Sequence, residues 1–409
     1  MEPLCVLCRG RGWCGKEFCP ILARFKLMKI VELKKEFLGT SPPGIFVGHC
    51  FYPKVYTGIL APPQHIENGR ILDRPELWYA QKASIEDVLG YRGQIIYSRF
   101  RANVKKPVGK LIELQQELVQ STKSLDVEIK LKRKPKFQMN FDIRTSPIAN
   151  QGLLKEARLV DSPKILKLVD RTVSDTDMRA VDAVAKLYSG KISVSTIEQV
   201  LACGLLGQSL ERKLVPTRWS ITATDDIVSS RLLENIKGYP EISEFQLFSN
   251  TYLGNHYEIL LMPRFWSYEL IEAKFPRSVW NMLGKDIVTY SNSESFFRRK
   301  EYAEETAGGY YAVRLAICEH LDKIKRQATA LVIRECLPDY WAPLGVWVCR
   351  ETCRGAFGQK PEVFPSLESA LENVKKKLKI SWAKIKQGSW LLKELKEQKT
   401  VAKFLSSCK

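Results

Sequence analysis

The chain begins with four cysteines at short, unequal spacings. Cys5, Cys8, Cys14 and Cys19 are separated by two, five and four residues, and gaps of this size let a chain turn around one metal ion. Four thiolates suit tetrahedral Zn(II), and they also suit an iron–sulfur cluster. Two disulfides or unpaired thiols are the alternatives without a metal. We predict a zinc site at these four cysteines, because nothing else in the sequence marks a secreted, disulfide-bonded chain.

The residues between these cysteines are turn formers, with Gly10, Gly12 and Gly15 among them. Glycine adopts the tight backbone conformations that allow sulfur atoms to converge. A segment this short cannot bury a hydrophobic core of its own. We therefore expect the bound metal to supply the folding free energy of the N-terminal segment.

A second group of chemically capable residues lies near the middle of the chain. Arg218 precedes Asp225 and Asp226, and the pattern predicts a strand at 219–223 followed by a helix capped by Thr224. The arginine would then lie at a strand end, facing two acids at a helix start, as a candidate phosphate or metal site. A structural role is the alternative, because the helix dipole alone favours acids at an N-terminus and the arginine could be their partner.

Four further residues extend this candidate catalytic site. His256 and Glu258 are two apart in a predicted strand and project from one face; Glu269 and Glu272 are three apart in a predicted helical turn. If these groups converge, they could hold Mg(II) or Mn(II) and act on a nucleotide or phosphodiester. A satisfied buried histidine is the alternative. The chain has no P-loop, kinase or HExxH signature, so the sequence leaves open whether the protein is an enzyme.

The end of the chain carries a short apolar pattern. Gln398 is followed by Val401, and then by the pair Phe404 and Leu405; in a helical turn the three apolar side chains share one face. The pattern resembles the peptide that binds the DNA sliding clamp, PCNA, by plugging an apolar pocket. Leu405 stands where a second aromatic residue is usual. The alternative is an amphipathic tail folded onto the body.

The formal net charge of +19 is unevenly distributed. Residues 375–409 hold eleven lysines and two acids, a net charge of +9, while residues 99–136 have a net charge of +7 and residues 1–41 of +4. The rest of the chain is nearly neutral, which favours a polyanionic partner, DNA or RNA. Solvated helix faces remain the alternative for 99–136. An anionic membrane is disfavoured, because no strongly amphipathic terminal helix accompanies the charge.

Length and composition indicate a folded intracellular protein. The 409 residues are 45% apolar and 27% charged, which suffices for two or three domains. The sequence shows no signal region and no apolar run long enough to span a membrane, and an odd total of eleven cysteines argues against a secreted disulfide framework. We expect a soluble, cytoplasmic protein that associates with the nucleoid.

The predicted elements mix strands and helix clusters without regular alternation, which indicates an α+β fold with antiparallel strands. We expect helices at 21–37, 310–323 and 366–388, a capping box at Ser195 and Glu198, and strands near 45–49, 55–58, 95–100, 257–262 and 344–348. The predicted domains are a four-cysteine zinc module with a helix at 1–41, an α+β core at 42–365, a lysine-rich helical region at 366–397 and the clamp-binding peptide at 398–405.

One stretch identifies a family resemblance. Residues 215–226 read VPTRWSITATDD in one-letter code, and residues 41–48 read SPPGIFVG. With the four cysteines before them and the terminal peptide after them, they resemble the archaeal Nre DNA-repair proteins over essentially the whole chain. The resemblance implies a role in the response to DNA damage, acting with the sliding clamp, and it implies no established catalytic reaction.

The leading hypothesis is therefore a non-catalytic, zinc-containing repair factor that contacts DNA through its basic segments and is recruited by the clamp. The first alternative is a metal-dependent enzyme that acts on a nucleotide or on damaged DNA through the central acids. An RNA-processing factor is the second alternative, because the basic segments do not distinguish DNA from RNA.

Overall fold

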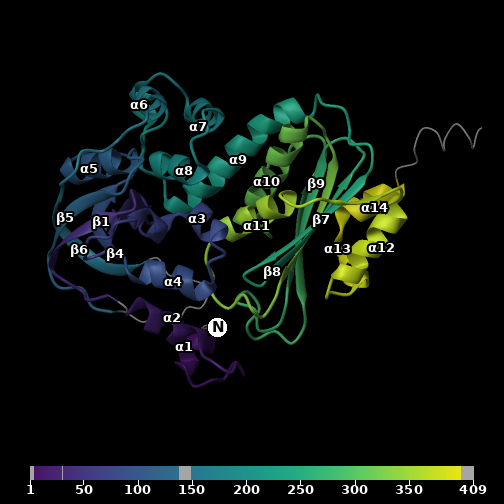
Figure 1. The fold of residues 1–409 in the computed structure, drawn as a ribbon, viewed down its shortest axis with the longest axis horizontal. Helices are drawn as coiled ribbons and strands as arrows, with labels where there is room; N and C mark the ends of the chain where they lie inside the picture. The colour runs from purple at the N-terminus through teal and green to yellow at the C-terminus, as the bar shows by residue number, and fades with distance from the viewer. Residues whose placement is uncertain (1–3, 30, 138–148, 398–409) are drawn as a thin grey trace, which may run out of the picture. The chain divides into compact units, whose positions relative to one another are not determined.

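The computed structural model describes residues 4–29, 31–137 and 149–397. The predicted clamp-binding residues Gln398, Val401, Phe404 and Leu405 lie outside these ranges. Contacts divide the chain into unit 1, residues 1–231 with 342–345, and unit 2, residues 232–341 with 346–409. Each unit contains a six-stranded sheet and its own helices (Figure 1), so the predicted α+β class is confirmed. The core predicted at 42–365 includes parts of both units.

The sheet of unit 1 has the strand order β1-β5-β6-β4-β3-β2, and its neighbours are antiparallel except for β4 and β6. Along β5 the buried residues alternate as Leu125, Val127, Ile129 and Leu131, the pattern of a strand with one face in the core. The strands are β1 Glu36–Ser41, β2 Gly44–Val47, β3 Lys54–Ala61, β4 Ile96–Asn103, β5 Leu125–Leu131 and β6 Asn150–Leu159.

The helices of unit 1 are mostly short, and α9 continues past residue 231 into unit 2. They are α1 Leu4–Cys8, α2 Pro20–Met28, α3 Pro75–Ala80, α4 Ile85–Gly93, α5 Lys110–Val119, α6 Lys167–Ser174, α7 Ala180–Ser189, α8 Val194–Ala202 and α9 Thr217–Ile236, with 3₁₀ turns at Gly69–Asp73 and Ser209–Glu211.

The sheet of unit 2 has the order β10-β9-β11-β8-β7-β12, antiparallel except for β9 and β11. Its strands are β7 Phe245–Tyr252, β8 Asn255–Met262, β9 Ser267–Lys274, β10 Val288–Glu294, β11 Thr329–Cys336 and β12 Glu362–Phe364. Its helices are α10 Gly308–Ile324, α11 Trp347–Phe357, α12 Leu367–Lys377, α13 Trp382–Gly388 and α14 Trp390–Glu397.

Helices cover both faces of the unit 2 sheet (Figure 1). On β8, Ile259 and Leu261 join a cluster with residues of α10 and α11, whereas Leu260 and Met262 join a second cluster with residues of α12, α13 and α14. Successive residues of a strand point to opposite faces. A strand buried on both faces is apolar at every position, which explains the continuous apolar run that predicts a strand at 257–262.

Two predicted elements are wrong in type or length. The helix predicted at 21–37 ends at Met28, and the residues from Glu36 form β1 instead. The strand predicted at 219–223 lies inside α9, which begins at Thr217. Its alternation of apolar and polar residues is too short to distinguish a strand from a helix that is buried on one side.

Three boundaries also differ from prediction. The first residue of α8 is Val194 and its cap is Ser193, whose hydroxyl accepts from Thr196 N–H at 3.3 Å, so the capping box predicted at Ser195 is wrong. The strand predicted at 344–348 is instead the approach to α11. The helix predicted at 366–388 is interrupted between Lys377 and Trp382.

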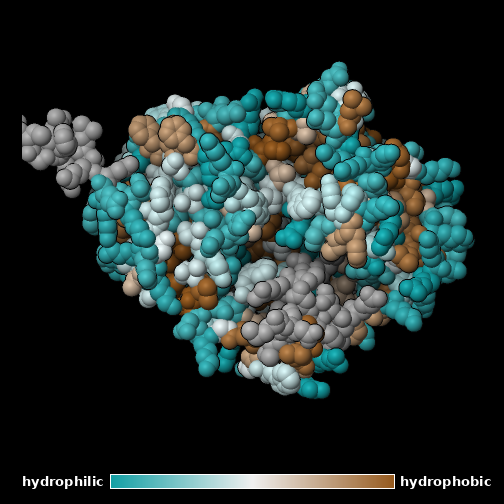
Figure 2. Space-filling view, turned by 180° about the vertical axis from the view of Figure 1, so that it is seen from behind, coloured by the Kyte–Doolittle hydropathy of each residue, from teal (hydrophilic) through white to brown (hydrophobic). Residues whose placement is uncertain are grey.

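The surface facing the viewer in Figure 2 is largely hydrophilic, and its apolar areas are separated by polar side chains. Exposed large apolar residues occur in both units, among them Phe51, Trp219 and Phe297. Within the described ranges, no helix combines the length and apolar character needed to cross a bilayer.

Candidate functional site

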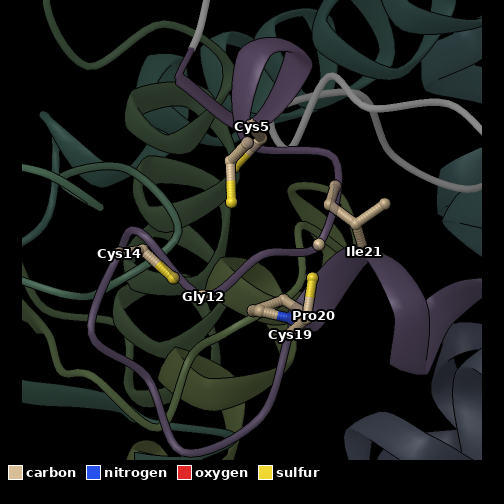
Figure 3. Close-up of a pocket in the computed structure, with 8 residues that line it drawn as sticks. Cys5, Gly12, Cys14, Cys19, Pro20 and Ile21 are labelled. Atoms are coloured by element: carbon tan, nitrogen blue, oxygen red, sulfur yellow. The ribbon is translucent and has the colours of Figure 1, made fainter.

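The four N-terminal cysteines line one small cavity (Figure 3). Cys5 and Cys8 lie on α1, Cys14 lies in the loop that follows, and Cys19 comes immediately before α2. Figure 3 shows the sulfur atoms of Cys5, Cys14 and Cys19 directed toward the space between them. The cavity encloses about 10 Å³, which is room for one water-sized particle.

The loop between α1 and α2 folds around the Cys8 sulfur atom. The backbone N–H of Trp13 lies 3.4 Å from Cys8 Sγ, and Gly10 and Gly12 adopt φ values of +87° and +80° that favour glycine. Burial raises the pKa of the Cys8 thiol, but the backbone N–H groups of residues 10–13 outweigh it and leave the pKa lowered. The loop therefore stabilises a thiolate, the form that binds metal.

Cys5 responds in the opposite direction. Burial is the largest cause of its raised pKa, and the negative charges of Cys14, Cys19 and Cys8 raise the pKa further. A cation among the four sulfur atoms would remove this repulsion. The donor set, the single-particle cavity and the N–H groups directed at Cys8 all fit a structural Zn(II) site.

The sulfur atoms share a cavity without forming a finished coordination sphere. Among the described residues, no group of three or more His, Cys, Asp or Glu side chains has the arrangement of a metal site, and no described cysteine is in a disulfide. We give the shared cavity and the Cys8 environment more weight than the absence of ligand spacing, because a metal ion itself draws four mutually repelling thiolates to coordination distance.

The central residues lie along α9 rather than at a strand–helix junction. Arg218 is exposed in the first turn, whereas Asp225 is fully buried two turns later. Seven residues of helix span about 10 Å, so the arginine does not face this acid as predicted. Asp226 is half-buried, and neither acid is without an interaction partner. Thr224 lies in the middle of the helix and is not its cap.

His256 and Glu258 do lie on one face of β8, as their spacing predicts. His256 Nε2 is 3.1 Å from Glu258 Oε1, although neither atom has a hydrogen bond of good geometry among the described residues. Ser249 donates to the other Glu258 oxygen at 2.8 Å, and Thr251 Oγ1 is 2.7 Å from His256 Nδ1. The pair is thus held by neighbouring residues of β7. It belongs to unit 2, whereas Arg218 and the two aspartates belong to unit 1.

Glu269 and Glu272 lie on β9, so the predicted helical turn is wrong and the two side chains point to opposite faces of the sheet. Glu272 accepts from the buried Arg334 guanidinium at 2.5 Å. Glu269 accepts from residues at the start of α14. Each carboxylate therefore has a structural partner on its own side of the sheet.

Comparison with known proteins assigns the family. Sequence families described as "Archaeal Nre, N-terminal" and "Archaeal Nre, C-terminal" match residues 13–281 and 294–404. This chain belongs to the archaeal Nre family. Together the two matches cover most of the Nre chain, in both structural units.

Curated relatives support the same assignment. The Nre chain is 37% identical over 401 residues to the DNA repair protein NreB of Archaeoglobus fulgidus, covering 98% of this chain and 100% of the relative. It is 36% identical to the DNA repair proteins NreA of the same organism and of Haloferax volcanii. These alignments cover 90% and 86% of this chain and 92% and 85% of the relatives. No solved structure matches it significantly.

Sequence reasoning missed one group of residues in this Nre chain. Phe51 and Tyr52 are exposed between β2 and β3, and Trp219 is exposed on the first turn of α9. The available signal was the pairing of these aromatics with arginines in stretches that lack acids. Because 219–223 was predicted to be a strand, the position of Trp219 on a helix surface could not be anticipated.

Proposed function

We propose that this Nre chain is a DNA repair protein recruited to DNA by the sliding clamp. The observation that carries the proposal is the 37% identity to a DNA repair protein over 98% of this chain and all of the relative. Similarity that includes both structural units supports a shared overall role. Binding of DNA is the simplest activity that this role requires.

The position of the terminal peptide supports recruitment by the clamp. α14 is anchored to unit 2, because Leu391 and Leu392 are buried in the cluster on that face of the sheet. The helix ends at Glu397, and Gln398 begins the predicted clamp-binding peptide. A peptide attached directly to a fixed helix would hold the protein close to the clamp and raise its local concentration on DNA.

The lysines of the C-terminal helices support contact with a polyanion, although not all equally. Lys375 and Lys377 pair with the nearby acids Glu372 and Glu362. By contrast, Lys386 lowers the pKa of Lys396, because the two ammonium groups lie close together on the surface. A phosphate between two crowded ammonium groups would relieve their repulsion. Lys386 and Lys396 are therefore better candidates for DNA contact than the two lysines paired with acids.

The zinc module completes the proposal. We infer that Cys5, Cys8, Cys14 and Cys19 bind one Zn(II), which holds the segment before α2 in its fold. The group would act structurally, because four protein ligands leave no open position for a substrate.

The clamp assignment is tested with Phe404→Ala, using calorimetric titration against the sliding clamp. The apolar plug would be lost, so we expect binding to fall below detection while the thermal unfolding midpoint is unchanged. Ser406→Ala is the matched control, since it alters the tail beside the plug. Clamp affinity retained by Phe404→Ala would remove recruitment from the proposal.

DNA binding is tested by measuring affinity for a DNA duplex at increasing salt. Phosphate contacts release counterions, so the logarithm of the binding constant should fall linearly with the logarithm of the salt concentration. The double variant Lys386→Ala/Lys396→Ala should bind more weakly than Lys375→Ala/Lys377→Ala. Affinity that does not change between low and moderate salt would contradict a phosphate-binding role.

The metal assignment is tested by elemental analysis of the purified protein. We expect about one zinc per chain, and we expect its loss in Cys8→Ala together with faster proteolysis of the first thirty or so residues. Cys50→Ala is the control, because Cys50 is exposed and lies outside the cavity. Iron in place of zinc would contradict the metal identity.

A further inference from the structure

An exposed row of aromatic and arginine side chains lies on unit 1, and we name it the aromatic–arginine strip. Its cationic end is formed on β4, where Arg99 and Arg101 are two apart and point to the same side. Tyr56 lies opposite Arg101 in the β3–β4 register. The Arg99 guanidinium lies 4.3 Å and the Arg101 guanidinium 5.1 Å from the Tyr56 ring centre. The strip comprises Arg99, Arg101, Tyr56, Phe51, Tyr52 and Trp219.

The strip continues from these arginines along the loop between β2 and β3. The Arg101 guanidinium also lies 5.4 Å from the Phe51 ring centre, and the ring centres of Tyr52 and Trp219 are 5.8 Å apart. Phe51, Tyr52 and Trp219 are 69%, 47% and 47% exposed. Three large rings this open to water bury little apolar surface in the fold, so folding does not explain their presence.

Backbone hydrogen bonds fix the loop that carries the rings. Gly48 N–H donates to Tyr56 C=O at 2.8 Å, and Lys54 N–H donates to Phe51 C=O at 2.9 Å. The Thr217 hydroxyl on α9 accepts from Val47 N–H at 2.9 Å, which ties the loop to the helix that presents Trp219. Phe51 has a φ of +66°, a conformation that is costly for a residue with a side chain. The loop thus holds an exposed ring in place at an energetic cost.

The charge around the strip has one sign. Residues 47–57, 96–106 and 215–224 contain no Asp or Glu. None of Arg99, Arg101 and Arg218 forms an ion pair with a residue that the structure describes. The cations also act on one another's surroundings, because a hydrogen bond from Arg101, followed by the charges of Arg99 and Lys132, lowers the pKa of Tyr56. Such a surface is complementary to a polyanion.

We propose that the aromatic–arginine strip binds single-stranded DNA, with unpaired bases stacked on Phe51, Tyr52 and Trp219 and the phosphates held by Arg99 and Arg101. Bases in a duplex present only their edges, whereas the bases of a single strand offer flat faces that match exposed rings. The choice of DNA over RNA rests on the proposed function. The strip itself is argued from unit 1 alone.

The proposal is tested with the full chain by fluorescence anisotropy of a labelled twenty-nucleotide oligothymidine. We expect Trp219→Ala and Phe51→Ala each to weaken binding by about fivefold or more, whereas Trp219→Phe retains most of the affinity. The double variant Arg99→Ala/Arg101→Ala should reduce the slope of log affinity against log salt by about one. Phe297→Ala and Arg158→Ala are the matched controls, because both residues are exposed and lie outside the strip.

Several outcomes would overturn the proposal. Unchanged affinity in the folded Trp219→Ala, Phe51→Ala and double arginine variants would exclude the strip. Tighter binding of an oligouridine would replace DNA with RNA as its ligand. Equal losses for a duplex of the same length would exclude base stacking. Clamp binding through the tail is measured separately, so its persistence in the strip variants would show that only the strip, and not the proposed function, had failed.

Discussion

The Ser389 hydroxyl donates a hydrogen bond of 2.5 Å to the Glu269 carboxylate. The same carboxylate accepts from the backbone N–H groups of Trp390 at 2.9 Å and Leu391 at 3.0 Å. These are donors at the start of α14 that have no partner within the helix. A residue of the central sheet therefore fixes the helix from which the C-terminal peptide emerges.

Glu269→Gln should lower the free energy of unfolding by about 2 kcal/mol, because the amide replaces one charged acceptor of a buried hydrogen-bonded group. Urea denaturation measures the change, and hydrogen exchange should show faster exchange along α14. Glu244→Gln is the control, since Glu244 is exposed. If α14 exchanges at the wild-type rate, Glu269 is not its anchor.

His320 makes stability depend on pH. Its ring stacks on Phe357 at 4.3 Å and lies 5.1 Å from Phe248, and its Nε2 has no hydrogen bond among the described residues. Burial, and secondarily the charge of Lys323, lowers the pKa of His320 to about 4. The unfolded chain therefore binds a proton below pH 6.5 that the folded chain refuses, and stability falls as the pH is lowered from about 6.5 to about 4.

His320→Phe should remove this contribution, which is about 3 kcal/mol at full extent. The measurement is urea denaturation of both proteins at pH 7 and at pH 4.5, where the variant should lose less stability than the wild type. His49→Gln should keep the wild-type pH dependence, because His49 is exposed. An identical pH dependence of His320→Phe and wild type would contradict the assignment.

Gly93 joins the cysteine segment to the body of unit 1. A Cβ atom at this position on α4 would lie 2.2 Å from the Leu27 carbonyl oxygen of α2, and Asn150 Nδ2 donates to the carbonyls of Met28 and Gly93 at 3.0 and 3.1 Å. Gly93→Ala must therefore move the two helices apart, at a cost of about 1–3 kcal/mol.

We expect Gly93→Ala to increase hydrogen exchange in α2 while the strands of unit 1 keep their protection. Gly388→Ala is the control, because no atom lies within 4 Å of an added Cβ there. Unchanged exchange in α2 would mean that the helices separate without consequence or that the contact is not needed.

The sequence predicted best where one local pattern decides the outcome. The apolar run at 257–262 could only be satisfied by a buried strand or helix, and its β-branched and aromatic content favoured the strand that β8 forms. His256 and Glu258 then had to share a face. The cysteine spacing predicted a shared cavity without any knowledge of the fold.

The sequence predicted poorly where distant residues decide the outcome. Glu269 and Glu272 read as a helical turn by spacing alone, but β9 forms because β10 and β11 pair with it on either side. The 219–223 alternation was likewise overridden by the helix that continues to Ile236. Tertiary pairing of this kind leaves no signal within a short window, so the central site could not be assembled from spacing.

The position of β11 imposes an order on synthesis. β8 and β9 are separated by only four residues in the chain, yet β11, more than fifty residues later, lies between them in the sheet. Until the ribosome has released residue 336, two apolar strands must wait with unsatisfied backbone groups at facing edges. A nascent chain that stalls before that residue would expose an adhesive gap to other chains, which makes the late arrival of one central strand a point of vulnerability in the birth of this protein.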